Sequence, residues 1–121
     1  MAKVMGIGGV FFRAKDPKML ADWYQTHLGI NPAPTDMNMQ PWISDEGVTV
    51  FAPFANDTDY FPKDCAFMLN FRVTELDAIL AEFRSAGIEI CKEEMMEGVG
   101  RFARIHDPEG NPVELWEPSG S

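Results

Sequence analysis

The chain has few of the residues that build disulfide frameworks or soft-metal centres. Two cysteines and two histidines occur among its 121 residues. Cys65 and Cys91 have no C-x-x-C spacing, which argues against a cysteine-rich zinc site or a disulfide scaffold. We expect both to be reduced thiols in a cytoplasmic protein.

Positive charge is also scarce. Lys and Arg number 10 against 19 for Asp and Glu, which gives a formal net charge of −9. An acidic chain of this kind is repelled by nucleic acid phosphates and by anionic membranes, so we expect neither as a partner. No apolar run is long enough to span a membrane, and the first residues lack the apolar core of a signal peptide.

The chain does have an ordinary apolar content, 45%, and enough length for a hydrophobic core. We predict one domain over residues 1–118, followed by a tail at 119–121. In the first half, alternating residues predict strands at 6–14, 42–44 and 48–54. Asp16 and Pro17 are good residues for a helix start, and Gly29 for its end.

After a linker at 56–64, a similar order of elements follows. Residues 65–73 are predicted to form a strand, and Thr74 is predicted to cap a helix that ends at Gly87, with Asp77 in its first turn. Residues 92–100 are predicted to be a polar loop. Further strands are predicted at 88–91, 102–105 and 113–117.

The two halves match one another in register. Arg13 corresponds to Arg72, and VTVFAP at 48–53 corresponds to VELWEP at 113–118. Such internal repetition predicts a duplicated unit. The fold class is therefore α+β, with two βαβββ modules at about 4–55 and 65–118. Their curled mixed sheets are expected to enclose a cleft between the faces that carry no helix.

Strand alternation predicts which side chains line that cleft. The set is mostly apolar and aromatic with a few polar groups, as in small-molecule pockets. It comprises Gly9, Phe11, Arg13, Thr49, Phe51, Met68, Asn70, Arg72, Glu114 and Trp116. Aromatic residues in strands also serve as plain core, so a cleft filled by its own side chains is an alternative.

The segments GGVFFRAKDPKMLADWYQTHLGI, FRVTELDAILAEFRSAGIEI and DPEGNPVELWEP together resemble the vicinal-oxygen-chelate superfamily. Glyoxalase I, extradiol dioxygenases and the bleomycin and fosfomycin resistance proteins belong to it. The resemblance covers nearly the whole chain and implies its fold. It does not choose among the many chemistries that this fold supports.

In metal-dependent members, His or Glu side chains on four strands hold the metal. Carried over to this sequence, those positions are Gly9, Thr49 (or Val50 by a slip of one residue), Met68 and Glu114. Glu114 is the one hard ligand in the set, whereas a divalent site needs at least three protein ligands. We therefore predict no cofactor and no metal, with Glu114 as the ligand if an ion does bind.

The resemblance to metal-free binders implies a small organic ligand in the cleft. The ligand-binding residues are predicted to be Phe11, Arg13, Phe51, Asn70, Arg72, Trp116, Trp42 and Tyr60. Glu114 could act as a general base if desolvated, or it could be ion-paired with Arg13 or Arg72.

Several functions remain open at this point. The first is a glyoxalase-like or bleomycin-resistance-like protein that binds a small molecule without metal. The second is a metal-independent lyase or isomerase that uses Glu114 as base. A metal-dependent lyase or dioxygenase with non-standard ligands and a scaffold with a filled cleft complete the set. A homodimer is expected, because equivalent modules can be exchanged between chains.

Overall fold

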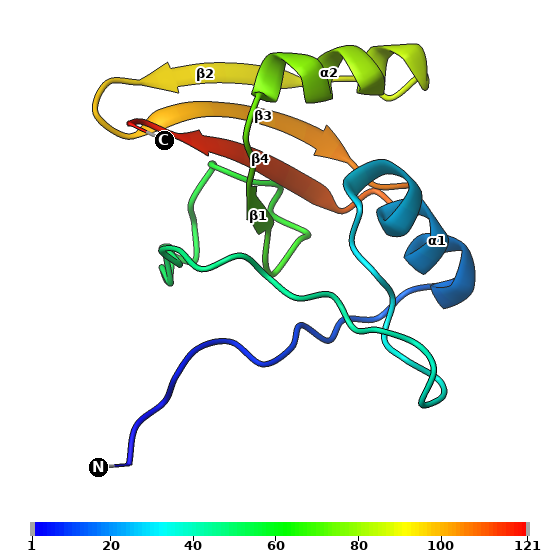
Figure 1. Ribbon diagram of the computed structural model, residues 1–121. Helices are drawn as coiled ribbons and strands as arrows, with labels where there is room; N and C mark the ends of the chain where they lie inside the picture. Colours follow the sequence, from blue (N-terminus) through cyan, green and yellow to red (C-terminus); the bar gives the residue numbers. More distant parts are fainter. Residues whose placement is uncertain (1, 121) are drawn as a thin grey trace.

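The computed structural model describes residues 2–120 as an α+β arrangement of two helices and four strands (Figure 1). Met1 and Ser121, which the predicted domain and tail included, lie outside the described residues. No helix within residues 2–120 is long and apolar enough to cross a membrane.

One mixed sheet organises the second half of the chain. Its strands are β1 (Leu69–Arg72), β2 (Lys92–Met96), β3 (Gly100–His106) and β4 (Pro112–Pro118), in the order β1-β4-β3-β2. β1 and β4 are parallel, and the other neighbours are antiparallel. Helix α2 (Leu76–Ser85) connects β1 to β2. The second half therefore forms the βαβββ unit that its sequence predicts.

The core lies between the sheet and both helices. α2 contributes a stripe of buried apolar residues at helical spacing, and the strands contribute alternate positions. The buried members are Leu20, Tyr24, Leu76, Leu80, Phe83, Ala103, Ile105, Val113 and Leu115. In Figure 1, α2 lies level with β2 and above β3 and β4, and the linker passes below the sheet. One face of the sheet is therefore free of helices.

Helix α1 (Pro17–Leu28) forms where local sequence signals place it. The Asp16 side chain accepts a hydrogen bond from the Met19 amide at 3.1 Å, and Pro17 is the first helical residue. Gly29 adopts the left-handed conformation at φ 68°, which favours glycine. Both predicted ends of this helix are confirmed.

The turn between β3 and β4 attaches α1 to the sheet. The Tyr24 hydroxyl donates a hydrogen bond to Asp107 Oδ2 at 2.8 Å, in a buried position. From the same turn, the Glu109 carboxylate accepts the amides of Lys15 at 2.6 Å and Asp16 at 2.8 Å. These contacts fix the start and the middle of the helix.

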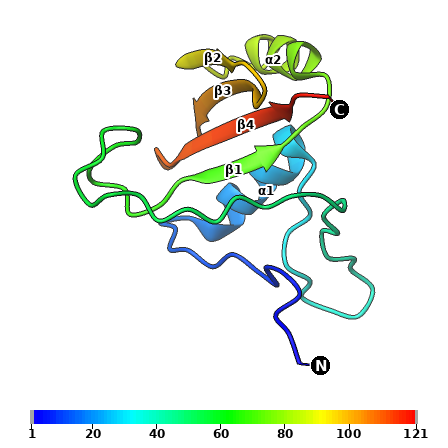
Figure 2. The same ribbon diagram turned by 90° about the vertical axis from the view of Figure 1, so that its left-hand side faces the viewer.

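The strands predicted in the first half are not formed in this single chain. Residues 6–14, 42–44 and 48–54 contain no strand, and Figures 1 and 2 show them as irregular chain. Alternation is nevertheless visible in burial, because Phe12 and Ala14 pack against the core while Phe11 and Arg13 are exposed. The two-module arrangement and its cleft stay predictions.

Two details of the second half correct the sequence prediction. The prediction of a strand at 88–91 is wrong. The observed strand, β2, begins at Lys92, inside the segment that was expected to be a polar loop. Every side chain of β2 is exposed, so its pairing with β3, rather than burial of one face, makes it a strand. The predicted Thr74 cap is also wrong: Glu75 precedes the helix at φ 52°, without a side-chain hydrogen bond.

A third correction concerns the start of the sheet. The strand predicted over residues 65–73 is limited to Leu69–Arg72, because β4, its only partner in the sheet order, pairs with it over those four residues. Asp77, expected near the helix cap, instead accepts a hydrogen bond from Arg101 of β3 at 2.7 Å.

Candidate functional site

Two rows of side chains cross the helix-free face of the sheet. Strand register places them opposite the buried apolar positions. The first row, from β2 to β1, is Lys92, Arg104, Glu114 and Asn70. The second row, in the same order, is Glu94, Phe102, Trp116 and Arg72. The first row is entirely polar and forms the centre of the candidate site.

Glu114 is the best-anchored side chain in the first row. It is 5% exposed, although a buried carboxylate needs partners to offset its lost hydration. Tyr60 Oη donates to Oε2 at 2.6 Å, and Asn70 Nδ2 donates to Oε1 at 2.8 Å. Both oxygens are thus engaged. The structure brings these three predicted site residues together.

Tyr60 reaches Glu114 from the linker. Its ring stacks on Phe54, with centroids 5.6 Å apart. Burial and the hydrogen bond to the Glu114 carboxylate raise the pKa of Tyr60 to about 12. The phenol therefore stays protonated near neutral pH and acts as a hydrogen-bond donor.

Arg104 belongs to this site although its role was not anticipated from the sequence. The residue is 8% exposed, and its Nη2 lies 3.7 Å from Glu114 Oε2. Its guanidinium carbon lies 5.0 Å from the Tyr60 ring centre, and Lys92 Nζ lies 4.6 Å from that centre. Both distances suit cation–π contact. Alternation of Phe102 and Arg104 with two apolar residues was the signal that could have found it.

A shallow pocket of about 330 Å³, widely open to solvent, adjoins this network. Its walls come from the linker and from β3, and they are Asp59, Tyr60, Phe61, Pro62, Lys63 and Arg104. The volume lies near the lower end of the range for small-molecule sites. The pocket and the buried polar row share Tyr60 and Arg104.

The second row contains an aromatic pair and an arginine with other partners. Trp116 stacks on Phe102 with centroids 6.0 Å apart and an interplanar angle of 4°, and its Nε1 donates to the Val99 carbonyl at 3.0 Å. Arg72 donates to the backbone carbonyl of Asp45 at 2.8 Å rather than to Glu114. Arg72 thus positions the chain at 45–47.

The remaining predicted site residues are not brought to Glu114. Phe11 is 97% exposed and Phe51 is 85% exposed, and Arg13 is also exposed. Their predicted strands do not form, so no register places them. Trp42 lies on the helix-covered side of the sheet. Its ring packs edge-to-face with the Phe71 ring, and the two ring centroids are 6.1 Å apart.

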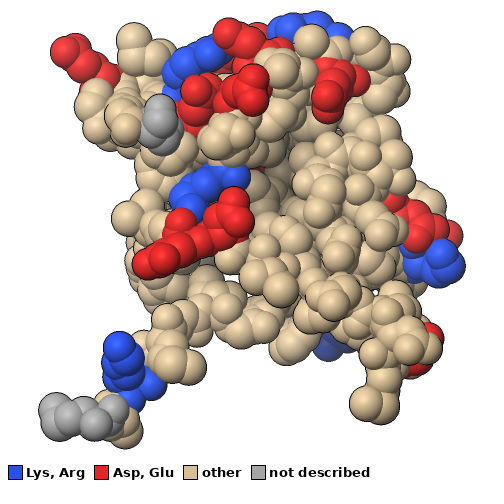
Figure 3. Space-filling view, viewed as in Figure 1, with Lys and Arg blue, Asp and Glu red and all other residues tan. Residues whose placement is uncertain are grey.

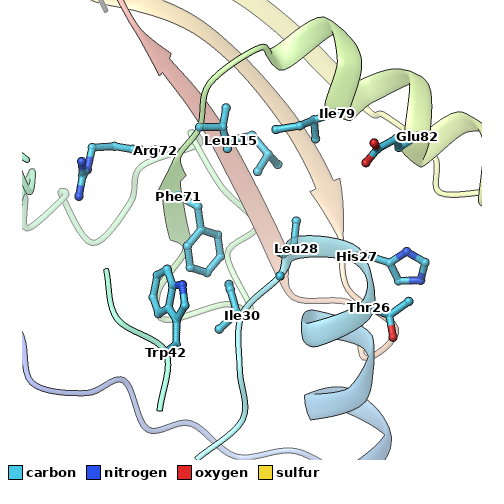
Figure 4. Close-up of a pocket in the computed structure, with 12 residues that line it drawn as sticks. Thr26, His27, Leu28, Ile30, Trp42, Phe71, Arg72, Ile79, Glu82 and Leu115 are labelled. Atoms are coloured by element: carbon cyan, nitrogen blue, oxygen red, sulfur yellow. The ribbon is translucent and has the colours of Figure 1, made fainter. Parts of the chain in front are cut away.

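A second pocket, of about 320 Å³, occupies that helix-covered side. It lies between the end of α1, α2 and the sheet, and Figure 4 shows Trp42 and Phe71 pointing toward one another there while Arg72 points away. Its labelled lining is mainly apolar, with His27 and Glu82 at one side. It lacks a buried polar network such as the one around Glu114.

Surface charge is unevenly distributed. In Figure 3, charged side chains gather along the upper edge, with further groups at the middle left and at the right edge, whereas the lower part of the visible face is mostly uncharged. That lower part belongs to the first half of the chain, where Val50 and Phe51 are among the exposed apolar residues.

The residues at the family's metal positions do not fit a divalent ion. Gly9 and Thr49 lie in exposed irregular chain, and both Glu114 oxygens accept hydrogen bonds within the protein. Within residues 2–120, no group of three or more His, Cys, Asp or Glu side chains is arranged to hold a metal. His106 Nδ1 instead lies 3.7 Å from Cys91 Sγ, on an exposed part of the surface.

Two solved structures that each match 96% of this chain support the fold. The antibiotic binding protein TnmS3 from Streptomyces sp. CB03234 is 24% identical, with a TM-score of 0.59 over 96% of this chain and 100% of its own. Lactoylglutathione lyase from Agrobacterium tumefaciens is 16% identical, with a TM-score of 0.62 over 96% of each chain. A glyoxalase family protein from Enterococcus faecalis, 25% identical with a TM-score of 0.41, matches about half of each chain, 53% and 52%.

Sequence comparison identifies the family. No curated protein is significantly similar to this chain. The profile of the glyoxalase-like domain, however, matches residues 9–116, which include both helices, the linker and nearly all of the sheet. The chain belongs to the glyoxalase-like domain family.

Proposed function

We propose that this protein binds a small organic molecule on the helix-free face of its sheet, without a metal. The observation that carries the proposal is the buried Glu114 carboxylate, held by Tyr60 and Asn70 beside a pocket of about 330 Å³. Burying an ionised carboxylate is costly, and its fixed hydrogen bonds create a preorganised polar centre.

The neighbouring side chains support binding of a ring-containing ligand. Phe102 and Trp116 form a flat stacked pair in the row next to Glu114, and Tyr60 forms a wall of the pocket. Aromatic surfaces with a few fixed polar groups are typical of small-molecule sites. One structural neighbour, TnmS3, is described as an antibiotic binding protein, which agrees with this function class.

Native mass spectrometry of the protein from its own source tests the proposal. We expect a mass increment from a bound small molecule that is lost in denaturing conditions. Glu114→Gln should reduce the increment, because the network that holds Tyr60 loses its charge. Glu89→Gln, a substitution of an exposed carboxylate, is the matched control. Protein that carries no ligand, and binds none from an extract of its source, would contradict the proposal.

A metal-independent lyase or isomerase is the second candidate. The 2.6 Å hydrogen bond between Tyr60 and Glu114 favours it, because a phenol and a carboxylate can donate and accept a proton in turn. For Glu114 to act as base, one of its two present donors must give way to substrate. Turnover of the molecule found by mass spectrometry, abolished in Glu114→Gln, distinguishes the enzyme from the binder.

We also propose that the protein acts as a homodimer. Apart from α1, residues 2–68 form no helix or strand, and they expose large apolar side chains such as Phe11, Val50 and Phe51. Large exposed apolar side chains of this kind are typical of surfaces that contact another chain. Exchange of the first-half strands between two copies would bury these residues and complete a cleft over Glu114.

A further inference from the structure

We infer that the ligand of this site carries a carboxylate, and that Arg104 is the residue that binds it. The inference rests on the proposed binding function and names the chemical class of the ligand. Its basis is an unusual pair of donors: Arg104 Nε and Nη2 are buried and have no hydrogen-bond partner. A buried donor without a partner costs free energy that an acceptor would recover.

The two nitrogens without partners form one edge of the guanidinium. Nε–H and the nearer N–H of Nη2 point in the same direction, which is the geometry that receives two carboxylate oxygens side by side. Glu114 does not take this edge. Its Oε2 lies 3.7 Å from Nη2, beyond hydrogen-bond length, because Tyr60 and Asn70 hold the carboxylate in place.

The surroundings of Arg104 suit an aromatic or otherwise flat carboxylate. Arg104 lines the pocket together with Tyr60 and Phe61, which offer ring surfaces, and Lys63, which adds a second positive charge. Asp59 is the one carboxylate in the lining. Both nitrogens are buried, and the guanidinium carbon lies 5.0 Å from the Tyr60 ring centre, so a ligand that reaches them has to displace that ring.

Three matched probes test the inference: benzoate, benzamide and benzylamine. Binding is followed by NMR through the Arg104 Nε–H signal and by Trp116 fluorescence. We expect benzoate to shift the Nε–H signal and to bind at least about tenfold more tightly than benzamide, because a charged two-point hydrogen bond is lost in the amide. Arg104→Gln should weaken benzoate binding by a similar factor and leave benzamide unchanged.

Arg101→Gln is the matched control, because Arg101 lies on the same strand but pairs with Asp77 outside the site. We expect normal benzoate binding in this variant. If Arg104→Gln does not fold, Arg104→Lys is used instead, because it keeps the charge and removes the two-point geometry. The Nε–H shift on addition of benzoate to the unaltered protein tests binding at Arg104 without any variant.

The outcomes separate the two proposals. Preferential binding of benzylamine, or benzoate binding that is equal in Arg104→Gln, would overturn the carboxylate inference and leave the binding function in place. A ligand from the natural source that lacks an acidic group would do the same. Absence of any copurified ligand together with failure of all three probes would overturn both.

Discussion

Tyr60 and Tyr24 are both phenols whose hydroxyls donate to carboxylates. The pKa of Tyr60 is raised to about 12, from an ordinary 10.0, by burial and by Glu114. Burial and Asp107 raise the pKa of Tyr24 as well. Ultraviolet titration of the folded protein should therefore show little tyrosinate at pH 10.0, where half of the free phenol is ionised. If either tyrosine ionised at its ordinary pKa, its buried hydrogen bond to a carboxylate would be contradicted.

The same shift gives a stability prediction. Because the folded pKa of Tyr60 is higher than the unfolded value of 10.0, its contribution to stability is complete below pH 10.0. That contribution is lost as the pH rises toward about 12. Tyr60→Phe should remove part of this alkaline loss, which can be measured by urea unfolding at several pH values. An unchanged alkaline profile in the variant would show that Tyr60 is not responsible.

Tyr24→Phe tests the contact between α1 and the turn. It removes the buried hydroxyl that donates to Asp107. A hydrogen bond to a charged group contributes about 1.5–3 kcal/mol, and we expect a loss of this size in the free energy of unfolding. Urea denaturation measures it. A loss below about 0.5 kcal/mol would mean that Asp107 is satisfied by its other donors.

Strand alternation places site residues on a common face where the strands form, and it fails in the first half of the chain, where the predicted strands do not form. Glu114 and Asn70 were assigned to one face by alternation, and the register places them opposite each other. Arg104 occupies the same row, but the strand predicted at 102–105 is not itself assigned a face toward the cleft. Tyr60 was anticipated as an aromatic contact, but its bond to Glu114 depends on the path of a linker that no periodicity specifies.

At the scale of elements, Glu109 is the side chain that holds the start of α1 from outside the helix. Glu109→Ala removes the acceptor of two backbone amides, at Lys15 and Asp16. By analogy with the loss of a helix cap, we expect a cost of about 1 kcal/mol. Hydrogen exchange should quicken at the start of α1 and stay unchanged in α2. Equal acceleration in both helices would indicate general destabilisation instead.

Elements with strong local signals could be predicted, and those formed by pairing could not. α1 has a capping Asp16, Pro17 in its first turn and Gly29 at its end, so neighbouring residues define it. β2 has the sequence KEEMM, which lacks alternation, and it is a strand because β3 offers hydrogen bonds along its length. Ile88 and Ile90 are alternate apolar residues that pack against the core, and this alternation wrongly predicts a strand at 88–91 instead of at Lys92–Met96.

At the scale of the whole molecule, the assembly can be tested directly. Light scattering at micromolar concentration should give twice the chain mass of 13.6 kDa. Phe51→Glu should shift the protein toward monomer, because it places a charge within the exposed apolar segment. Met37→Glu, at a fully exposed position elsewhere in the first half, is the control. A monomer at every concentration would contradict the dimer.

The proposed metal independence can also be tested on the whole molecule. Because Gly9 and Thr49 supply no strong ligand and Glu114 is internally bonded, an ion would bind weakly. Treatment with a chelator should leave the melting temperature unchanged to within about a degree, since only tight binding to the folded state adds stability. A stoichiometric metal that survives dialysis would show that the ligands lie elsewhere.

The position of β4 has a consequence for synthesis on the ribosome. β4 follows every other strand in the sequence, yet it lies between β1 and β3 and contributes buried Val113 and Leu115. Until residue 118 has left the ribosome, β1 has no strand to pair with. The apolar face of α2 can then pack only against β2 and β3. The nascent chain therefore exposes apolar surface until β4 has been synthesised. A ribosome that stalls before β4 leaves an incomplete chain with exposed apolar surface, which chaperones or proteases can bind.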